Sequence, residues 1–358
     1  MKEQWLIRLH SLVGLLAGIF ILTLSVSGSI LLFHDEIDAF QQPMVGYMKG
    51  NKKLLTVDSC YKIVQQQYPQ ALISSCSLPE KEGKAFSFIL YDSSYQQGAK
   101  ALQIFIHPIT GHIVKIRGGS EDLKNNFMSW LATFHNSFHA GKTGEWLLEL
   151  FSMLFLISIV TGIILYRNNI IAVLTFKKLV WKKNNLHQII GTWALLFNLM
   201  IGITGCWMQR YVFKKEFYQN NHWVNVIKSS PPLSFNFDTA YSNLKNTYPN
   251  FTGYVIYFAQ NSNGKTSIYG SNNTNAFIHS KKLADVISLD SSGAIYTTRL
   301  VNENSPSDYY DIVNSQLHMG KYGGMPVKII YSLLGLASGF LSITGFVLWW
   351  NRKKRSIL

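Results

Sequence analysis

Four stretches of the chain are long and apolar enough to cross a bilayer as helices. A bilayer core about 30 Å thick requires roughly 20 apolar residues of helix. None of the stretches has an acidic or basic residue deep in its middle, and Lys328 lies near one end of the last. The first is too long for a signal peptide and lacks a small-residue cleavage site, so we expect an uncleaved anchor. The predicted spans are Leu12–Phe33, Trp146–Tyr166, Ile189–Met208 and Val327–Trp350.

The two long segments between the spans share another pattern. Each begins with an amphipathic helical stretch that ends in Tyr-Pro, and strand-like runs of aromatic and β-branched residues follow, with a turn between strands. The helices are expected over 57–68 and 237–248, the clearest strands over 86–91 and 253–258, and the turns over 107–111 and 290–293. The predicted fold class is an α-helical membrane protein with four transmembrane helices and two small α+β domains outside the cytoplasm.

Charge decides the orientation. The chain of 358 residues has 33 Lys+Arg against 19 Asp+Glu, and the densest basic runs adjoin apolar stretches. This placement indicates membrane orientation rather than nucleic-acid binding, because Lys and Arg flanking a span mark its cytoplasmic end. Basic residues lie at the N-terminus, between spans two and three and at the C-terminus, so both termini should be cytoplasmic. These residues are Lys2, Arg8, Arg167, Lys177, Lys178, Lys182, Lys183, Arg352, Lys353, Lys354 and Arg355.

The chain also repeats itself. The separation from His10 to Gly28 in the first span equals that from His187 to Gly205 in the third. Spans two and four match as well, through Thr161-Gly162 and Thr344-Gly345 near their cytoplasmic ends. Aligning those pairs matches His135 with His318, whereas aligning the preceding glycine-lysine elements matches His139 with His318. The unit is therefore span, outer domain, span, used twice.

Histidines at matched positions are the candidates for chemistry. A neutral imidazole is a good axial ligand for haem iron, and cofactor sites in bundles use side chains from facing helices. We expect His10 and His187 to ligate haem iron at the cytoplasmic side, with Gly14 and Gly191 giving room for the macrocycle. At the outer side we expect His318 with His135, or with His139 as second choice, and His34 is a further candidate. Two alternatives are interfacial polar histidines and an ion shared by His135 and His139.

The cysteines allow two interpretations. Three cysteines give no disulfide framework and no Cys-x-x-Cys metal pair. Cys60 and Cys76 lie in the same predicted outer domain and could form a bridge, or all three could be buried free thiols.

A family resemblance rests on these residues. Leu9-His10 with Gly14, and the run Ser27 to Asp38, resemble the opening of PepSY-associated transmembrane proteins. The run Leu317 to Gly320 with Gly323-Gly324, and Thr344-Gly345 with Trp349-Trp350, are similar to later parts of that family. One departure is His107, which stands where PepSY turns usually have Asp.

The resemblance implies PepSY-like outer domains in the periplasm and a bacterial inner-membrane location. The expected parts are transmembrane helices over 1–34, 134–168, 186–210 and 316–351, periplasmic domains over 35–133 and 211–315, a basic cytoplasmic loop over 169–185 and a cytoplasmic tail over 352–358.

The activity that the resemblance implies is a haem-dependent oxidoreductase of the ferric-siderophore reductase type, with two haem b groups. The expected partners are a ferric siderophore or other ferric chelate outside, a cytoplasmic reductase or membrane quinol as electron donor, and the lipid bilayer. The alternative function is a non-enzymatic PepSY-domain membrane protein that binds or regulates an envelope partner such as a protease.

Overall fold

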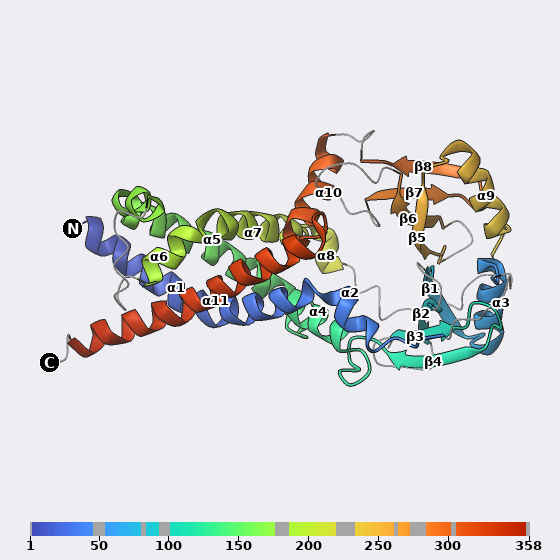
Figure 1. The fold of residues 1–358 in the computed structure, drawn as a ribbon, viewed down its shortest axis with the longest axis horizontal. Coiled ribbons are helices and arrows are strands. Elements are labelled where there is room, and N and C mark those ends of the chain that lie inside the picture. Colours follow the sequence, from blue (N-terminus) through green and yellow to red (C-terminus); the bar gives the residue numbers. More distant parts are fainter. Residues whose placement is uncertain are drawn as a thin grey trace. The chain divides into compact units, whose positions relative to one another are not determined.

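The chain folds into two compact units, drawn in Figure 1. The structure is a computed structural model, and it describes residues 2–45, 54–79, 84–92, 101–175, 186–219, 233–260, 264–272, 284–301 and 306–355. The helical unit comprises residues 1–34, 131–217 and 314–358, and the sheet unit comprises residues 35–130 and 218–313. Most of the predicted basic loop between spans two and three lies outside the described residues.

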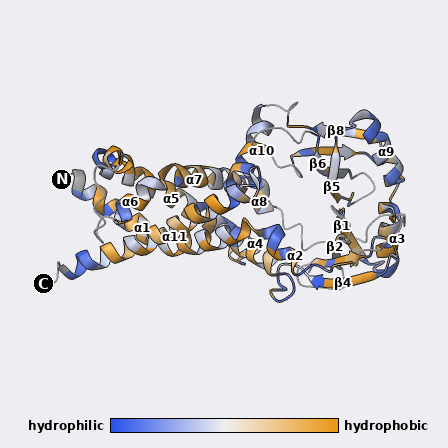
Figure 2. Cartoon of the chain, in the orientation of Figure 1, coloured by the Kyte–Doolittle hydropathy of each residue, from blue (hydrophilic) through white to orange (hydrophobic). Residues whose placement is uncertain are grey.

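Three described helices are long and apolar enough to cross a membrane: α1 (Lys2–Leu31), α5 (Gly141–Leu174) and α11 (Gly324–Arg355). The predicted third span is bent, because α6 (Leu186–Trp193) meets α7 (Leu195–Gln209) and η1 (Arg210–Phe213) at 64°. Hydrophobic residues cover much of these helices, as Figure 2 shows. The described part of the chain therefore has three candidate spans, and a fourth if the bent pair is one span.

Shorter helices precede or follow the long ones along the chain. They are α2 (His34–Ala39), α4 (Phe127–Ser137), α8 (Lys215–Gln219) and α10 (Pro306–Met319). The predicted ranges 134–168 and 316–351 are thus not single helices. Phe138 and His139 adopt positive φ angles of 50° and 56°, which ends α4 before α5 begins. The alternative of an ion shared by His135 and His139 requires helical spacing between them, and the helix that holds His135 ends at Ser137.

Small residues let α1 and α11 approach closely. A Cβ atom on Gly335 would lie 2.7 Å from the Ser29 hydroxyl, and Gly339 faces Ser25 in the same way one turn later. The Ser29 hydroxyl donates a hydrogen bond to the Ser332 carbonyl at 3.2 Å. Helices in membranes associate through such small-residue contacts, since lipid provides no hydrophobic drive between them.

The sheet unit contains one antiparallel sheet of eight strands in the order β4-β3-β2-β1-β5-β6-β7-β8. The first four strands are β1 (Ala71–Ser77), β2 (Phe86–Asp92), β3 (Ala101–Ile106) and β4 (Ile113–Gly118). The second four are β5 (Thr252–Tyr257), β6 (Thr266–Ser271), β7 (Asp285–Leu289) and β8 (Ile295–Arg299). The strands and turns predicted near residues 86, 107, 253 and 290 are all present.

The two outer regions are not independent domains, because β1 pairs with β5 across the middle of the sheet. Cys76 lies opposite Ile256 in this pairing. One hydrophobic core continues across it, where Phe258 from the second region contacts Tyr61 and Phe88 from the first. The pairing thus covers one edge strand of each region, which would otherwise expose unpaired backbone groups.

Two helices meet the same core with their N-termini facing each other. They are α3 (Val57–Gln67) and α9 (Phe237–Thr247), and both confirm the predicted helical stretches. The Asp58 carboxyl accepts hydrogen bonds from the backbone of Phe237 and Asp238 at 3.0 and 2.9 Å. The Asp238 carboxyl accepts from the backbone of Val57 and Asp58 at 3.1 and 2.9 Å. Each carboxyl thus caps the helix of the other region.

The two carboxyls in this arrangement differ in acidity. Burial, together with the hydrogen bond to Asp238, raises the pKa of Asp58. Burial acts the same way on Asp238, but hydrogen bonds from Asp58 and Val57 outweigh it and lower the pKa of Asp238. As the pH falls, Asp58 therefore binds a proton before Asp238 does.

The turn where the sequence departs from the PepSY pattern keeps its hydrogen bonds. Asp290 accepts from the backbone of Ser292 and Ala294 in the β7–β8 turn, at 2.8 and 3.1 Å. In the β3–β4 turn the His107 Nδ1 atom accepts from the backbone of Ile109 and Thr110, at 3.2 and 3.3 Å. His107 therefore replaces the turn-forming role of an aspartate without its charge.

Cys60 and Cys76 are both buried and free in this structure. Burial raises the pKa of Cys60 to about 12 and that of Cys76 well above its usual value. The thiolate is the reactive form of cysteine, so both thiols are poor nucleophiles. Resistance of the native protein to alkylation would therefore not indicate a bridge; labelling in denaturant would be needed.

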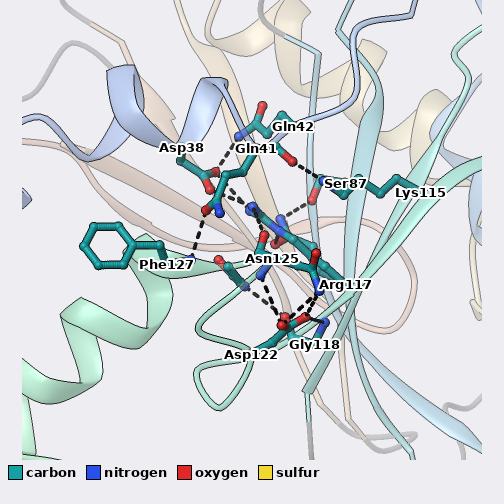
Figure 3. A network of polar contacts seen from close by, with 12 residues as sticks. Asp38, Gln41, Gln42, Ser87, Lys115, Arg117, Gly118, Asp122, Asn125 and Phe127 are labelled. Carbon is teal, nitrogen blue, oxygen red and sulfur yellow. Dashed lines mark hydrogen bonds and ion pairs between the residues drawn. The ribbon is translucent and has the colours of Figure 1, made fainter.

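A buried ion pair fixes α2 to the edge of the sheet. Figure 3 shows Arg117 on β4 meeting the Asp38 carboxylate through two nitrogen–oxygen contacts, at 2.7 and 3.0 Å. The Arg117 and Asp38 side chains are only 2% and 5% exposed. Arg117 also donates to Gln103 at 2.8 Å. Breaking such a pair by removing one partner typically costs about 3–5 kcal/mol, so this network holds the start of the sheet unit firmly.

Candidate functional site

Four histidines in the helical unit have the same surroundings. The His10 ring on α1 lies against α5, where its Nδ1 atom is 3.0 Å from the Thr161 hydroxyl and 3.1 Å from the Ser158 carbonyl. The next residue, Gly162, leaves the space that the ring fills. A Cβ atom there would lie 3.3 Å from His10 Cε1, closer than most side chains pack.

We call this arrangement a hydroxyl-glycine cradle: the histidine Nδ1 atom meets a Thr or Ser hydroxyl, and the ring faces the glycine that follows the hydroxyl residue. It occurs three more times. His187 Nδ1 is 2.9 Å from the Thr344 hydroxyl, His318 Nδ1 is 2.9 Å from the Thr204 hydroxyl, and His135 Nδ1 is 2.8 Å from the Ser27 hydroxyl. The glycine that follows each hydroxyl residue faces the same ring, with Cβ-to-Cε1 distances of 3.5, 3.3 and 3.0 Å for Gly345, Gly205 and Gly28. Every cradle therefore joins two helices, one bearing the histidine and the other the hydroxyl and glycine.

The cradles fix which ring nitrogen carries the proton. A hydroxyl has one proton to donate. In all four cradles this proton goes to a backbone carbonyl one turn earlier: Thr161 to Ile157, Thr204 to Met200, Thr344 to Phe340 and Ser27 to Thr23, at 2.8, 2.8, 3.0 and 2.8 Å. With its proton in that bond, the hydroxyl oxygen accepts from Nδ1–H, and at His10 the Ser158 carbonyl, which can only accept, supports the same tautomer. Each neutral imidazole is thus held with its Nε2 lone pair available, which is the form that binds a metal.

His10 and His187 form the first histidine pair. Their ring centroids are 6.3 Å apart and the ring planes are nearly perpendicular, at 81°. Two imidazole nitrogens that share one metal, at about 2 Å from each, leave the ring centroids roughly 6 Å apart. The spacing of the first pair therefore suits one metal centre between the rings.

His135 and His318 form the second histidine pair. Both are held by cradles, and their rings are close enough to interact electrostatically. Along α1 the first pair lies at the level of His10 and the second at the level of Ser27, which are about 25 Å apart in a helix. The two pairs therefore lie near opposite ends of the apolar part of the helical unit.

The other candidate histidines lack this arrangement. His139 follows the end of α4 in a left-handed conformation, and its ring lies 6.3 Å from that of Phe134. His34 begins α2, outside the four cradles. Within the described residues no group of three or more His, Cys, Asp and Glu side chains is arranged to hold a metal ion. The structure thus brings His135, rather than His139, together with His318.

Sequence reasoning identified the histidines but not their partners. Ser27-Gly28, Thr161-Gly162, Thr204-Gly205 and Thr344-Gly345 served only as markers of the repeat, yet each holds the ring of a histidine. The signal was that each marker recurs at a fixed distance after a histidine, with the glycine 18 residues after His10 and His187 and 27 residues after His135 and His318. A Cβ atom on Gly14 would lie 3.9 Å from the Ser158 hydroxyl, and one on Gly191 would lie 3.6 Å from the Leu341 side chain. No histidine ring is therefore the nearest neighbour of either glycine. Their predicted place beside a macrocycle stays a prediction.

Comparison with known families gives one match over nearly the whole chain. The model of the PepSY-associated TM region matches residues 7–352. The chain belongs to the PepSY-associated TM family. The match includes all four cradles and the whole described sheet, so this PepSY-associated TM protein is a multi-pass membrane protein with an antiparallel sheet unit. No curated protein matches the sequence.

Proposed function

We propose that this protein is a haem-containing electron conduit that reduces ferric iron, bound to a siderophore or another chelate, on the periplasmic side of the inner membrane. The observation that supports it most is the repeated cradle, which holds two histidine pairs at opposite ends of a membrane-spanning bundle. A protein that only bound an envelope partner would not need paired imidazoles with free Nε2 lone pairs at two depths.

The residues present suit two haem b groups. His10 and His187 would hold one haem, and His135 and His318 would hold the other. Haem, when bound, supplies a one-electron redox couple. The protein's own contribution is to fix each ring through the Thr or Ser hydroxyl, to set its tautomer, and to keep Nε2 aimed away from the hydroxyl that holds Nδ1.

The topology in this proposal has four spans, with the bent α6–α7 pair as the third. Both termini are cytoplasmic, so the first histidine pair lies near the cytoplasm and the second near the periplasm. Electrons would enter from a cytoplasmic reductase or a membrane quinol and leave toward a ferric chelate near the sheet unit. The observation behind this orientation is the set of basic residues at both termini and beside the second and third spans.

A reporter that is active only in the cytoplasm tests this topology. Fused after Lys178 or after Leu358 it should be active, and fused after Gly50 or after Asn263 it should be inactive. The physical reason is that basic flanks stay on the cytoplasmic side during insertion. Activity at Gly50 would contradict the four-span arrangement.

Transport of electrons outward is tested in sealed vesicles. Vesicles that contain the protein and an internal reductant should reduce a ferric siderophore presented outside, measured by trapping of Fe(II) with a colour-forming chelator. Vesicles without the protein control for leakage. If reduced haem in the protein is never reoxidised by any ferric chelate, the reductase function is wrong and the alternative of a regulatory PepSY protein gains support.

A further inference from the structure

One carboxyl is buried inside the helical unit, on a helix that crosses the membrane. Glu149 on α5 is 3% exposed, and its Oε2 atom has no hydrogen-bond partner among the described residues. A carboxyl inside a membrane is costly, and such residues typically mark routes for ions or protons. Buried polar atoms without partners are rare in folded proteins, so this one requires an explanation.

Glu149 interacts with the turn of α7 that holds His318, one member of the second histidine pair. Cys206 on α7 interacts electrostatically with Glu149. The two residues before it, Thr204 and Gly205, form the cradle of His318. Asn314 on α10 donates to the Thr204 carbonyl at 3.2 Å, which ties this turn to the helix that bears His318. One short segment of α7 thus separates the buried carboxyl from the histidine.

A second buried acceptor lies on the helix that bears His318. The Oε1 atom of Gln316, two residues before His318 on α10, is buried and has no partner within the described part of the chain. Glu149 and Gln316 contribute the two unsatisfied buried side-chain oxygens of the described structure. Both atoms are acceptors, so each can take a further hydrogen-bond donor.

We propose that Glu149 takes up one proton when a haem held by the second histidine pair gains an electron, and releases it when that haem loses the electron. This inference rests on the proposed function. Each cycle balances: one electron comes from the donor and one proton from water, the carboxylate becomes a carboxylic acid, and both steps reverse when the ferric acceptor takes the electron. In a medium of low dielectric an added electron repels a nearby carboxylate strongly, and the proton removes that repulsion.

Among the titratable groups around Glu149, Glu149 itself is the suitable proton acceptor. Cys206 faces it from α7, His318 lies beyond the same turn, and His135 shares the second pair with His318. One turn outward on α5, Glu145 is bonded to Tyr211 of η1. The α1 helix has no charged residue after Arg8. Glu149 is therefore the fully buried carboxyl among these groups, and Glu145 provides a matched control.

The test is a redox titration of the purified full-length protein, followed by haem absorbance at a series of pH values. One proton per electron shifts the midpoint by about 59 mV for each tenfold change in proton concentration. We expect this slope for the second haem in the wild type and in Glu145→Gln, and its loss in Glu149→Gln. A slope that survives in Glu149→Gln, or a wild-type midpoint independent of pH, would overturn the proposal.

A second measurement does not depend on folding of the variant. The infrared difference spectrum of reduced minus oxidised wild type should contain the carbonyl stretch of a newly protonated carboxylic acid, and its absence would overturn the proposal. Wild-type protein that contains no haem would contradict the proposed function and, with it, the role of Glu149. Haem whose midpoint potential does not change with pH would contradict only the role of Glu149.

Discussion

Replacing His10 or His187 with alanine should remove the same share of bound haem, namely that of one of two haems. The two rings lie 6.3 Å apart and are held by equivalent cradles, so each supplies one face of the same centre. The double variant should lose little more than either single variant, because residues that act as a unit are not additive. Absorbance of the purified variants, normalised to protein, measures the loss.

The second pair gives the matching experiment. His318→Ala and His135→Ala should share a different fraction of the absorbance, whereas His139→Ala and His34→Ala should leave the haem content unchanged, since neither residue has a cradle. These last two variants are the controls for a general effect of losing an imidazole. If His10→Ala and His187→Ala both retain full low-spin haem, the first centre is wrong and the argument from the matched halves is wrong with it.

Replacing a cradle threonine with valine should weaken haem binding by about 10–100-fold, the usual cost of losing a hydrogen-bond partner of a metal-bound histidine. Thr161→Val and Thr344→Val remove the hydroxyl that accepts from Nδ1–H of His10 and His187 while keeping the side-chain shape. The Ser158 carbonyl remains as a second acceptor for His10, so the larger loss is expected for Thr344→Val. Titration of haem into the haem-depleted variants measures the change in affinity.

Thr192→Val is the matched control for these threonine variants. Thr192 is buried in α6, and its hydroxyl donates to the Gln188 carbonyl at 2.8 Å, as the cradle hydroxyls do to theirs. It lies in no cradle. Equal losses of haem affinity in Thr192→Val and Thr161→Val would mean that helix stability, rather than ring orientation, determines binding.

The sequence predicted the helices and strands of this fold better than the way they pair and connect. Apolar length located α1, α5 and α11, and alternation located the strands around Phe88 and Ile256, because both patterns are local. The β1–β5 pairing that fuses the two outer regions depends on two strand edges far apart in the chain, and neither edge has a local signature. The break at Phe138 and His139 was hidden because it lies between two helix-forming runs.

The candidate site shows the same division. Repetition in the sequence identified His10, His187, His135 and His318, since matched positions are visible in one dimension. Their pairing with Thr161-Gly162 and the other three hydroxyl-glycine elements depends on which helices are neighbours, and only the structure gives that. Glu149 was missed because it lies near the end of an apolar stretch, where a single acidic residue resembles an interfacial one.

The visible spectrum of the detergent-purified protein, oxidised and then reduced, shows whether haem is bound at the two histidine pairs. Two histidine pairs with free Nε2 atoms predict low-spin haem b with two histidine ligands, at two haems per chain, that changes reversibly on reduction. A protein that purifies without haem, and does not bind haem when it is supplied, would contradict the account and favour a PepSY-associated membrane protein that acts by binding a partner.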